Sequence, residues 1–206
     1  MKIECDYSLL EHNTFGIDAK CRRFVEYESV EEAQEAVRSL KEEDHPLLIL
    51  GGGSNLLLTE DYKGTVLHSG ISFIEDVGGG RVRCGSGYVW DDFVAYCVSH
   101  GLYGAENLSI IPGECGASAV QNIGAYGAEA KDLIEEVEAV ETATGRVRHF
   151  KNTDCGYSYR QSRFKHEWRN KYLITSVTYR LSSTYRPRLD YGNIRTALAE
   201  RGIAHP

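Results

Sequence analysis

The sequence predicts a fold of mixed helices and strands, and three observations support this. Apolar residues recur at helical spacing over 30–40 and again over 90–100, which indicates two amphipathic helices. Short apolar or alternating segments, separated by glycine-rich turns, indicate strands. With 206 residues, of which 42% are hydrophobic and 26% charged, the chain can bury one sizeable core or two small ones.

The first helix has the clearest start. Ser29 is a good N-cap, and Glu32 three residues later predicts a capping box, in which each side chain accepts the other residue's backbone N–H. Residues 46–50 are fully apolar and predict a strand that is buried on both faces. The three glycines 78–80 predict a hairpin turn, since strand-like segments flank them. The other expected elements are strands at 24–27, 65–68, 73–77, 81–84, 134–140, 147–150 and 172–181, and a helix at 193–200.

Charge and cysteine content exclude several classes of protein. The formal net charge of −7 argues against nucleic acid or an anionic membrane as the main partner. The six cysteines are scattered, with neither a Cys-x-x-Cys pair nor a histidine at zinc spacing, so no metal site is predicted. Scattered thiols are typical of a reduced, intracellular protein, and no apolar run has the length of a signal peptide or a membrane span. We therefore expect a cytoplasmic protein.

Two glycine-rich stretches are the candidate binding segments, and the first, 51–55, directly follows the apolar strand. Ligands of open α/β sheets gather where strands end in loops, and successive glycines can turn several backbone N–H groups toward one phosphate oxygen. No Gly-Lys-Ser/Thr follows, so the loop is not a Walker P-loop, and Leu56 stands at the third glycine of the dinucleotide fingerprint. The alternative is a flexible turn.

The second stretch, 111–127, contains four glycines and a single acid, Glu114. Its low side-chain bulk allows a ligand to approach the main chain closely. Gln121 and Asn122 carry neutral amides suited to a polar ring edge, and Tyr126 adds a flat apolar face. These residue types favour a segment that binds a cofactor, although a tightly packed loop between two elements has the same pattern.

One arginine is a candidate for chemistry. Arg160 follows Tyr159, and its fork suits a substrate carboxylate, but a surface arginine stacked on tyrosine has the same spacing. It opens the strongest positive run of this acidic chain, which ends at His166. No catalytic triad follows from the spacing, and Cys115 has no neighbour in the sequence that lowers its pKa.

Four motifs, taken in order, resemble one family. They are His-Asn-Thr-Phe-Gly at 12–16, Gly-Gly-Gly-Ser-Asn at 51–55, Ile-Pro-Gly at 111–113 leading to Gln-Asn-Ile-Gly-Ala-Tyr-Gly at 121–127, and Tyr-Arg at 159–160 with Phe-Lys at 164–165. The family is that of the UDP-N-acetylenolpyruvoylglucosamine reductases (UDP-N-acetylmuramate dehydrogenases) of bacterial peptidoglycan synthesis. The resemblance extends from about residue 12 to about residue 195. It implies the α+β fold of the p-cresol methylhydroxylase type, with FAD held between two α+β subdomains, 1–66 and 67–206.

The resemblance also implies an oxidoreductase reaction. NADPH would reduce the flavin of FAD, and the hydride would pass to the enolpyruvyl group of UDP-N-acetylglucosamine enolpyruvate, giving UDP-N-acetylmuramate. Arg160 would be catalytic, stabilising charge on the substrate, and Tyr159 and Tyr191 would bind the nucleotide sugar. The residues implied for FAD are Gly51, Gly53, Ser54, Asn55 and Leu56 around the pyrophosphate, and Pro112, Gly113, Gln121, Asn122, Ile123, Gly124 and Tyr126 around the rest.

The sequence departs from the family in one large respect. The family's serine proton donor and a further glutamate lie in stretches that have no counterpart here, because the chain stops at Pro206. We therefore expect the C-terminal substrate domain to be absent and the chain to bind FAD but turn over poorly, whereas a full-length member is expected to be monomeric. The alternatives are another flavin oxidoreductase of the same fold, or a non-catalytic module that binds FAD or a nucleotide and acts through a partner.

Overall fold

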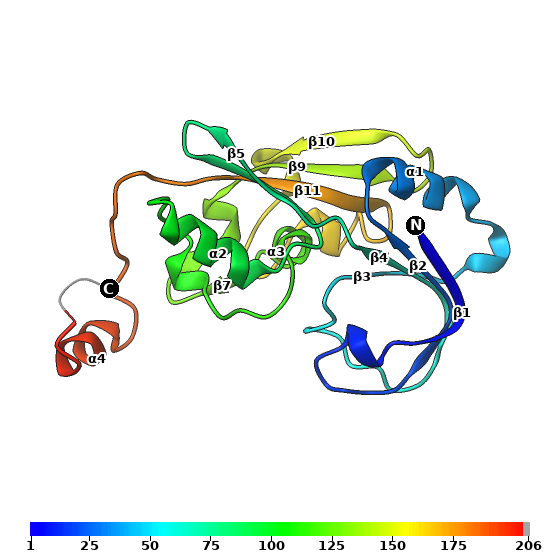
Figure 1. Ribbon diagram of the computed structural model, residues 1–206, viewed down its shortest axis with the longest axis horizontal. Coiled ribbons are helices and arrows are strands. Elements are labelled where there is room, and N and C mark those ends of the chain that lie inside the picture. Colours follow the sequence, from blue (N-terminus) through cyan, green and yellow to red (C-terminus); the bar gives the residue numbers. More distant parts are fainter. Residues whose placement is uncertain (204–206) are drawn as a thin grey trace.

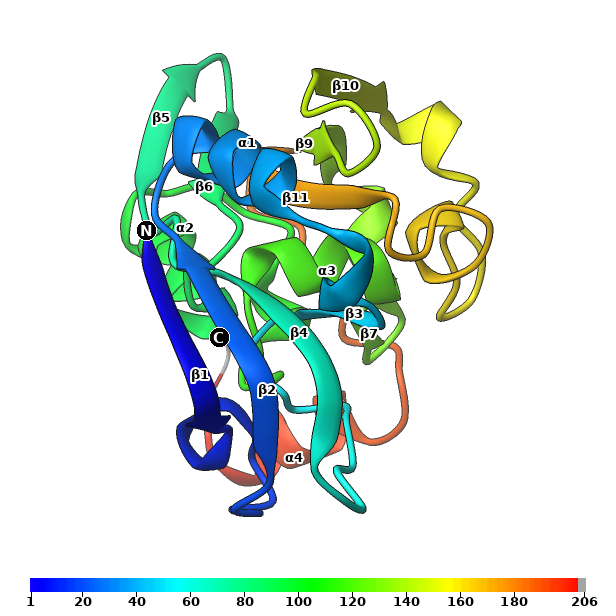
Figure 2. The same cartoon turned by 90° about the vertical axis from the view of Figure 1, so that its right-hand side faces the viewer.

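Two β-sheets form the framework of the computed structural model, which describes residues 1–203. The first sheet has the strand order β1-β2-β4-β3. Strand β1 is antiparallel to β2, whereas β2 and β3 both run parallel to β4. Figure 2 shows β1, β2 and β4 side by side. The bounds of these strands are β1 (Lys2–Ser8), β2 (Lys20–Tyr27), β3 (Leu47–Leu50) and β4 (Tyr62–Ser69).

The second sheet is antiparallel throughout, in the order β10-β9-β11-β6-β5. A two-stranded ribbon, β7 (Gly124–Ala125) with β8 (Ala128–Glu129), lies outside it. Figure 1 shows the second sheet above α2 and α3, with the first sheet at the other end of the molecule. Its strands are β5 (Ile74–Gly78), β6 (Arg81–Gly85), β9 (Ile134–Glu141), β10 (Val147–Lys151) and β11 (Tyr172–Arg180).

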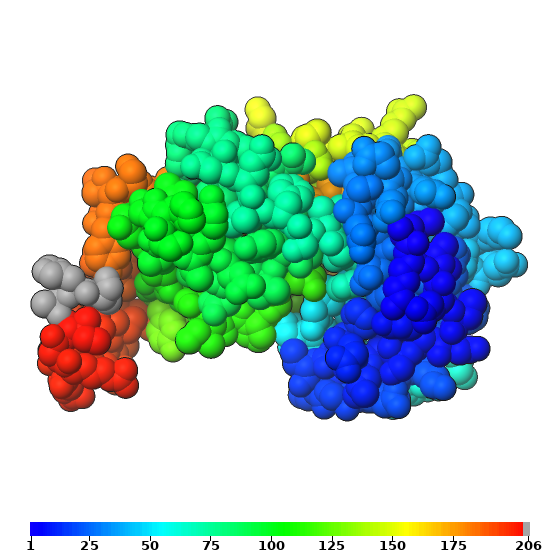
Figure 3. Space-filling view, viewed as in Figure 1, coloured from blue at the N-terminus to red at the C-terminus, as the bar shows by residue number. Residues whose placement is uncertain are grey.

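Helix α1 (Val30–Ser39) joins the two sheets. It packs against β2 of the first sheet and against β9 and β11 of the second. Its buried face, Ala33, Ala36 and Val37, shares one apolar cluster with Val140 and Leu173 of the second sheet. The sheets are therefore held together by a continuous core. Each sheet with the segments packed on it forms one lobe of the molecule, and Figure 3 shows the two lobes in contact.

Helices α2 (Trp90–Ser99) and α3 (Cys115–Gln121) cover the second sheet. The fully buried ring of Trp90 lies 5.7 Å from that of Tyr179 on β11, between ring centroids. Helix α4 (Ile194–Glu200) buries no residue and lies apart from both lobes in Figure 1. Short 3₁₀ turns complete the described chain, at Leu10–His12, Glu42–Asp44, Glu106–Leu108, Ala130–Asp132, Asn152–Cys155 and Arg163–Lys165.

The structure confirms most of the predicted elements and corrects two details. The Ser29 side chain accepts the backbone N–H of Glu32 at 3.1 Å, but the Glu32 carboxylate accepts from Glu28, not from Ser29. Only half of the capping box forms, because Glu32 also binds the amino group of Met1. Strand β3 is half-buried, not buried on both faces, because it is an edge strand of its sheet.

Strand β1 and helix α3 form at positions where the sequence analysis expected no strand or helix. Strand β1 is largely exposed and pairs with β2 alone, so its residues lack the apolar pattern of a core strand. Helix α3 forms inside the glycine-rich stretch 111–127. Strand β4 ends at Ser69, so the expected subdomain boundary at 66/67 falls inside that strand.

Candidate functional site

A cavity of about 530 Å³ lies between the two sheets. Strand β3 and the glycine loop after it form one wall, helix α3 forms the second, and residues 164–170 form the third. Tyr27, Ser69 and Ser86 add hydroxyl groups to the lining. The cavity volume is in the range of small-molecule binding sites. Strand β3 is only half-buried because one side of this edge strand borders the cavity.

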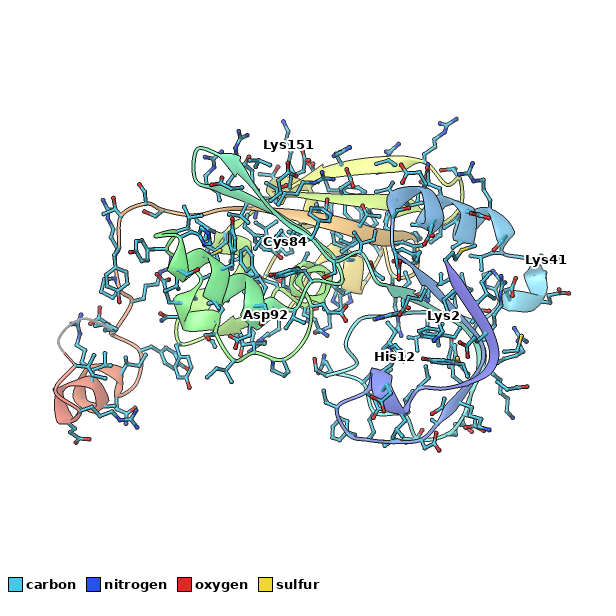
Figure 4. The ribbon with its side chains drawn as sticks, in the orientation of Figure 1. Lys2, His12, Lys41, Cys84, Asp92 and Lys151 are labelled. Atoms are coloured by element: carbon cyan, nitrogen blue, oxygen red, sulfur yellow. The ribbon has the colours of Figure 1, made fainter. Side chains whose placement is uncertain are left out.

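The glycine loop, residues 51–56, forms its wall with main chain. Gly53 has φ +63°, and a Cβ there would lie 2.0 Å from the carbonyl oxygen of His12, so no other residue fits. Figure 4 labels His12 at the base of the first sheet. In the part of the chain that the structure describes, none of the backbone N–H groups of 51–56 donates a hydrogen bond. Unpaired N–H groups in a loop that lines a cavity suit an anionic ligand.

The structure brings the two glycine-rich stretches together. The Ser54 hydroxyl donates to the carbonyl oxygen of Pro112 at 3.0 Å, across 58 positions of sequence. A Cβ at Gly113, where φ is +127°, would lie 3.3 Å from the same hydroxyl. Both stretches therefore border one site, although they belong to different sheets.

Helix α3 places one predicted side chain on the cavity. Gln121 lies at the end of the helix, and its Oε1 accepts from Lys165 Nζ at 3.4 Å. Lys165 also donates to the carbonyl oxygen of Arg160 at 3.1 Å. The cavity thus has an amide and a cation on the same side.

Asn122, the next residue, serves the fold. It is fully buried with φ +45°, and its Nδ2 donates to Glu129 Oε2 at 2.7 Å and to the carbonyl oxygen of Ser158 at 2.8 Å. Its Oδ1 accepts the backbone N–H of Lys131 at 2.9 Å. The amide therefore joins three segments, and Asn122 acts on the site by positioning the stretch 121–127. Ile123 is buried in the core of the second sheet.

The predicted catalytic arginine lies outside the cavity lining. Arg160 is exposed, and its guanidinium donates to the carbonyl oxygen of Gly124. The ring of Tyr126 meets that of Tyr191 edge-to-face, with the centroids 6.1 Å apart. Tyr159 is 77% exposed. Arg160, Tyr126 and Tyr191 therefore lie around the ribbon β7–β8, and none of them lines the cavity.

Two residues at the site escaped the sequence reasoning. Asn107 donates to the carbonyl oxygens of Tyr126 and Arg188, both at 2.9 Å, and so fastens the segment before α4 to the ribbon. Glu114 lines the cavity beside the glycine loop, where burial, followed by the charge of Glu26, raises the pKa of its carboxyl group to about 8. Each depends on neighbours far away in the sequence, so no local pattern could have revealed it.

Two further findings concern metals and membranes. Among residues 1–203, no three His, Cys, Asp or Glu side chains come together as a metal site would require. None of the described helices combines the length and apolar character needed to cross a membrane.

Comparisons with known proteins identify the family to which the chain is similar. A family model described as an FAD binding domain matches residues 21–151. The UDP-N-acetylenolpyruvoylglucosamine reductase of Bacteroides fragilis (strain YCH46) is 52% identical over 200 residues, covering 95% of this chain and 60% of the relative. That of Neisseria meningitidis serogroup B is 43% identical over 196 residues, covering 93% and 57%. The chain thus spans about 60% of the length of the curated relatives it matches.

Solved structures show the same fold. The UDP-N-acetylenolpyruvylglucosamine reductase of Thermus caldophilus superposes with a TM-score of 0.72 at 25% identity, covering 100% of this chain and 71% of that one. The 6-hydroxy-D-nicotine oxidase of Arthrobacter nicotinovorans has a TM-score of 0.66 at 21% identity, covering 87% and 42%, and supports the fold alone. The predicted α+β fold of the p-cresol methylhydroxylase type is confirmed. The chain belongs to the FAD binding domain family, and its curated relatives over nearly its whole length are UDP-N-acetylenolpyruvoylglucosamine reductases.

Proposed function

We propose that this chain binds FAD in the cavity between the sheets and is the FAD-binding part of an NADPH-dependent reductase of peptidoglycan synthesis. The substrate would be UDP-N-acetylglucosamine enolpyruvate and the product UDP-N-acetylmuramate. One observation carries the cofactor proposal: the glycine loop, whose backbone N–H groups donate no hydrogen bond within the described chain, lines a cavity that is also lined by the second glycine-rich stretch. The names of the curated relatives support the reaction.

The residues present fit the cofactor. Gly51, Gly53, Ser54, Asn55 and Leu56 would donate backbone N–H groups to the diphosphate, which needs several donors and no intervening side chain. The residues proposed for the rest of the cofactor are Pro112, Gly113, Gln121, Asn122, Ile123, Gly124 and Tyr126, with Asn122 and Ile123 acting through the backbone they hold in place.

The flavin, when bound, supplies the hydride chemistry, and the protein supplies position and charge. Arg160 would stabilise negative charge developing on the substrate carboxylate. Its guanidinium is oriented by the carbonyl oxygen of Gly124, and a fixed cation loses little energy to reorganisation during the reaction. Tyr159 and Tyr191, which are 77% and 58% exposed, have surface available for the nucleotide sugar.

We further propose that these 206 residues bind FAD but turn over little substrate. The chain covers 60% and 57% of the length of two curated reductases, so a large part of those proteins has no counterpart in these residues. A longer protein that includes this chain would work as a cytoplasmic monomer.

A flavin titration tests the cofactor proposal. FAD is added to the purified chain, and its fluorescence and visible spectrum are followed for the wild type, Gly53→Ala and Gly79→Ala. Gly79 has almost the same φ as Gly53, +65°, but a Cβ there meets nothing within 4 Å, so it controls for backbone strain alone. We expect saturable binding that Gly53→Ala weakens at least tenfold and Gly79→Ala leaves unchanged.

Absence of FAD binding by a wild-type chain with a native near-UV spectrum would overturn the proposal. Equal affinity for Gly53→Ala and wild type would also contradict it. The reaction itself is tested in a longer protein that contains this chain: NADPH should bleach the bound flavin, and the enolpyruvyl nucleotide should restore its colour.

A further inference from the structure

The carboxyl group of Glu114 lies directly against the glycine loop. Its Oε2 is 3.1 Å from the position that a Cβ on Gly51 would take, and its Oε1 is 3.5 Å from the corresponding position on Gly52. Glu114 also lines the cavity itself. An acid thus occupies the edge of the loop that the proposed function assigns to a diphosphate.

Backbone contacts hold the main chain at Glu114 in place. Glu114 forms an isolated antiparallel β-bridge with Val89. The backbone N–H groups of the next two residues, Cys115 and Gly116, donate to the carbonyl oxygens of Tyr88 and Ser86, both at 2.9 Å. A Cβ on Gly116 would lie 2.7 Å from the Ser86 side chain, so α3 packs tightly against this connection. The backbone that carries the Glu114 side chain is therefore fixed beside the loop.

Within residues 1–203 the Glu114 carboxyl group has no hydrogen-bond donor and no ion-pair partner. It is the N-cap residue of α3, yet its side chain makes no cap hydrogen bond. The charge that faces it from β2 is Glu26, also an acid, which lies 3.6 Å from His68 on β4. Tyr27 on β2 is neutral near pH 7, because burial raises the pKa of its hydroxyl. The basic residues on the cavity lie on the third wall and form no ion pair with Glu114: Lys165, His166 and Arg169.

Such surroundings favour the neutral form of a carboxylic acid. The pKa of Glu114 is raised to about 8 by burial and then by the charge of Glu26. At pH 7 the group therefore carries a proton and is a hydrogen-bond donor. A carboxylate in the same position would repel an anion, whereas a carboxylic acid can donate to one.

We propose that Glu114 is a positioning residue for the anionic ligand of the glycine loop, donating a hydrogen bond from its protonated carboxyl group to a phosphate oxygen. This inference rests on the proposed function, because it takes the diphosphate of FAD as that ligand. It makes cofactor binding depend on one proton, which the protein already holds at pH 7 and must take up at pH 9.

The expected effect is a pH-dependent affinity. Below about pH 8 the Kd for FAD stays constant, and above it Kd rises tenfold for each pH unit, because one proton accompanies each FAD. At pH 9.5 the wild type should bind FAD about 30-fold more weakly than it does on the plateau well below pH 8.

The test is the flavin titration between pH 6 and 9.5 with three variants. Glu114→Gln keeps the shape and an N–H donor but cannot ionise, so its Kd should be near that of the wild type at pH 7 and flat above pH 8. Glu114→Ala is also neutral but has no donor, so it should bind at least fivefold more weakly than Glu114→Gln at every pH. Glu75→Gln removes the same charge from an exposed position on β5 and should behave like the wild type.

Calorimetry adds a second readout. Titrations at pH 9 in buffers of different ionisation enthalpy should show proton uptake close to one per FAD for the wild type and none for Glu114→Gln. Equal pH slopes for wild type and Glu114→Gln, or equal proton uptake, would overturn the inference while leaving FAD binding intact. If no variant binds FAD at any pH, the proposed function itself fails.

Discussion

Replacing Glu114 by Gln should stabilise the protein without ligand, by an amount that depends on pH. The carboxyl group has its ordinary pKa of 4.5 in the unfolded chain and one of about 8 in the folded chain. The folded state therefore binds more protons than the unfolded state between these values, so stability falls as pH rises from about 4.5 to about 8. Below pH 4.5 the wild-type group is neutral in both states, and the variant should match it.

The size of the effect follows from the same two pKa values. The change from 4.5 to about 8 corresponds to an upper limit of about 5 kcal/mol at 1.36 kcal/mol per pH unit. Glu114 is only partly buried, so solvent screening reduces this limit, and we take roughly half, about 2–3 kcal/mol, as the expected difference above pH 8.

Urea denaturation at pH 5, 7 and 9 measures this difference. Comparing the variant with the wild type at each pH cancels the contributions of all other titrating groups. The gain of Glu114→Gln in free energy of unfolding should grow from near zero at pH 5 to its full value at pH 9, whereas Glu75→Gln should show no such trend. A gain that is the same at pH 5 and pH 9 would refute the reasoning.

Three further substitutions test the contacts that shape the site. Asp44→Asn should cost about 3 kcal/mol in urea denaturation, because it leaves the half-buried guanidinium of Arg23, now 2.6 Å from the carboxylate, without its counter-charge; an unchanged midpoint would contradict this. Asn122→Ala should cost about 2–4 kcal/mol by the same assay, since three buried hydrogen bonds lose their partner, and a loss under 1 kcal/mol would show that water replaces the amide. Gly116→Ala should cost about 1–3 kcal/mol through its clash with Ser86, and Ser86→Gly should restore at least 1 kcal/mol of that; additive losses in the double mutant would exclude the clash.

The pH dependence of the Asp44 pair has the opposite sign to that of Glu114. Although burial opposes it, the Arg23 guanidinium holds the pKa of Asp44 below its ordinary value. The stability contributed by this pair is therefore present near neutral pH and is lost as pH falls through the folded-state pKa. Asp44→Asn should remove that loss at acid pH.

Elements with strong local signals were predictable from the sequence. The Ser29 cap with its amphipathic helix, the helix that starts at Trp90 and the hairpin at 78–80 all form where expected. Each depends on residues within a few positions of one another, and local spacing records such interactions directly. The two glycine-rich stretches were likewise recognisable as candidate binding segments, because low bulk and amide side chains are properties of composition, and residues of both line the cavity.

What the sequence could not determine depends on partners far along the chain. Strand β1 forms by pairing with β2, and β3 is half-buried because it is an edge strand that borders the cavity. The sequence analysis expected the Asn122 amide to contact a ligand. In the fold it binds the carbonyl oxygen of Ser158 and the backbone N–H of Lys131 instead.

The contacts and the electrostatic environment of the site also depend on residues far apart in the sequence. By itself the sequence determined the fold class and the main helices and strands, and it singled out the two stretches that border the cavity. The tertiary structure alone decided that Ser54 reaches Pro112 and that Glu114 is buried beside Glu26 without a cation. The physical reason is that burial and charge at a point are sums over neighbours in space, and those neighbours come together only when the chain has folded.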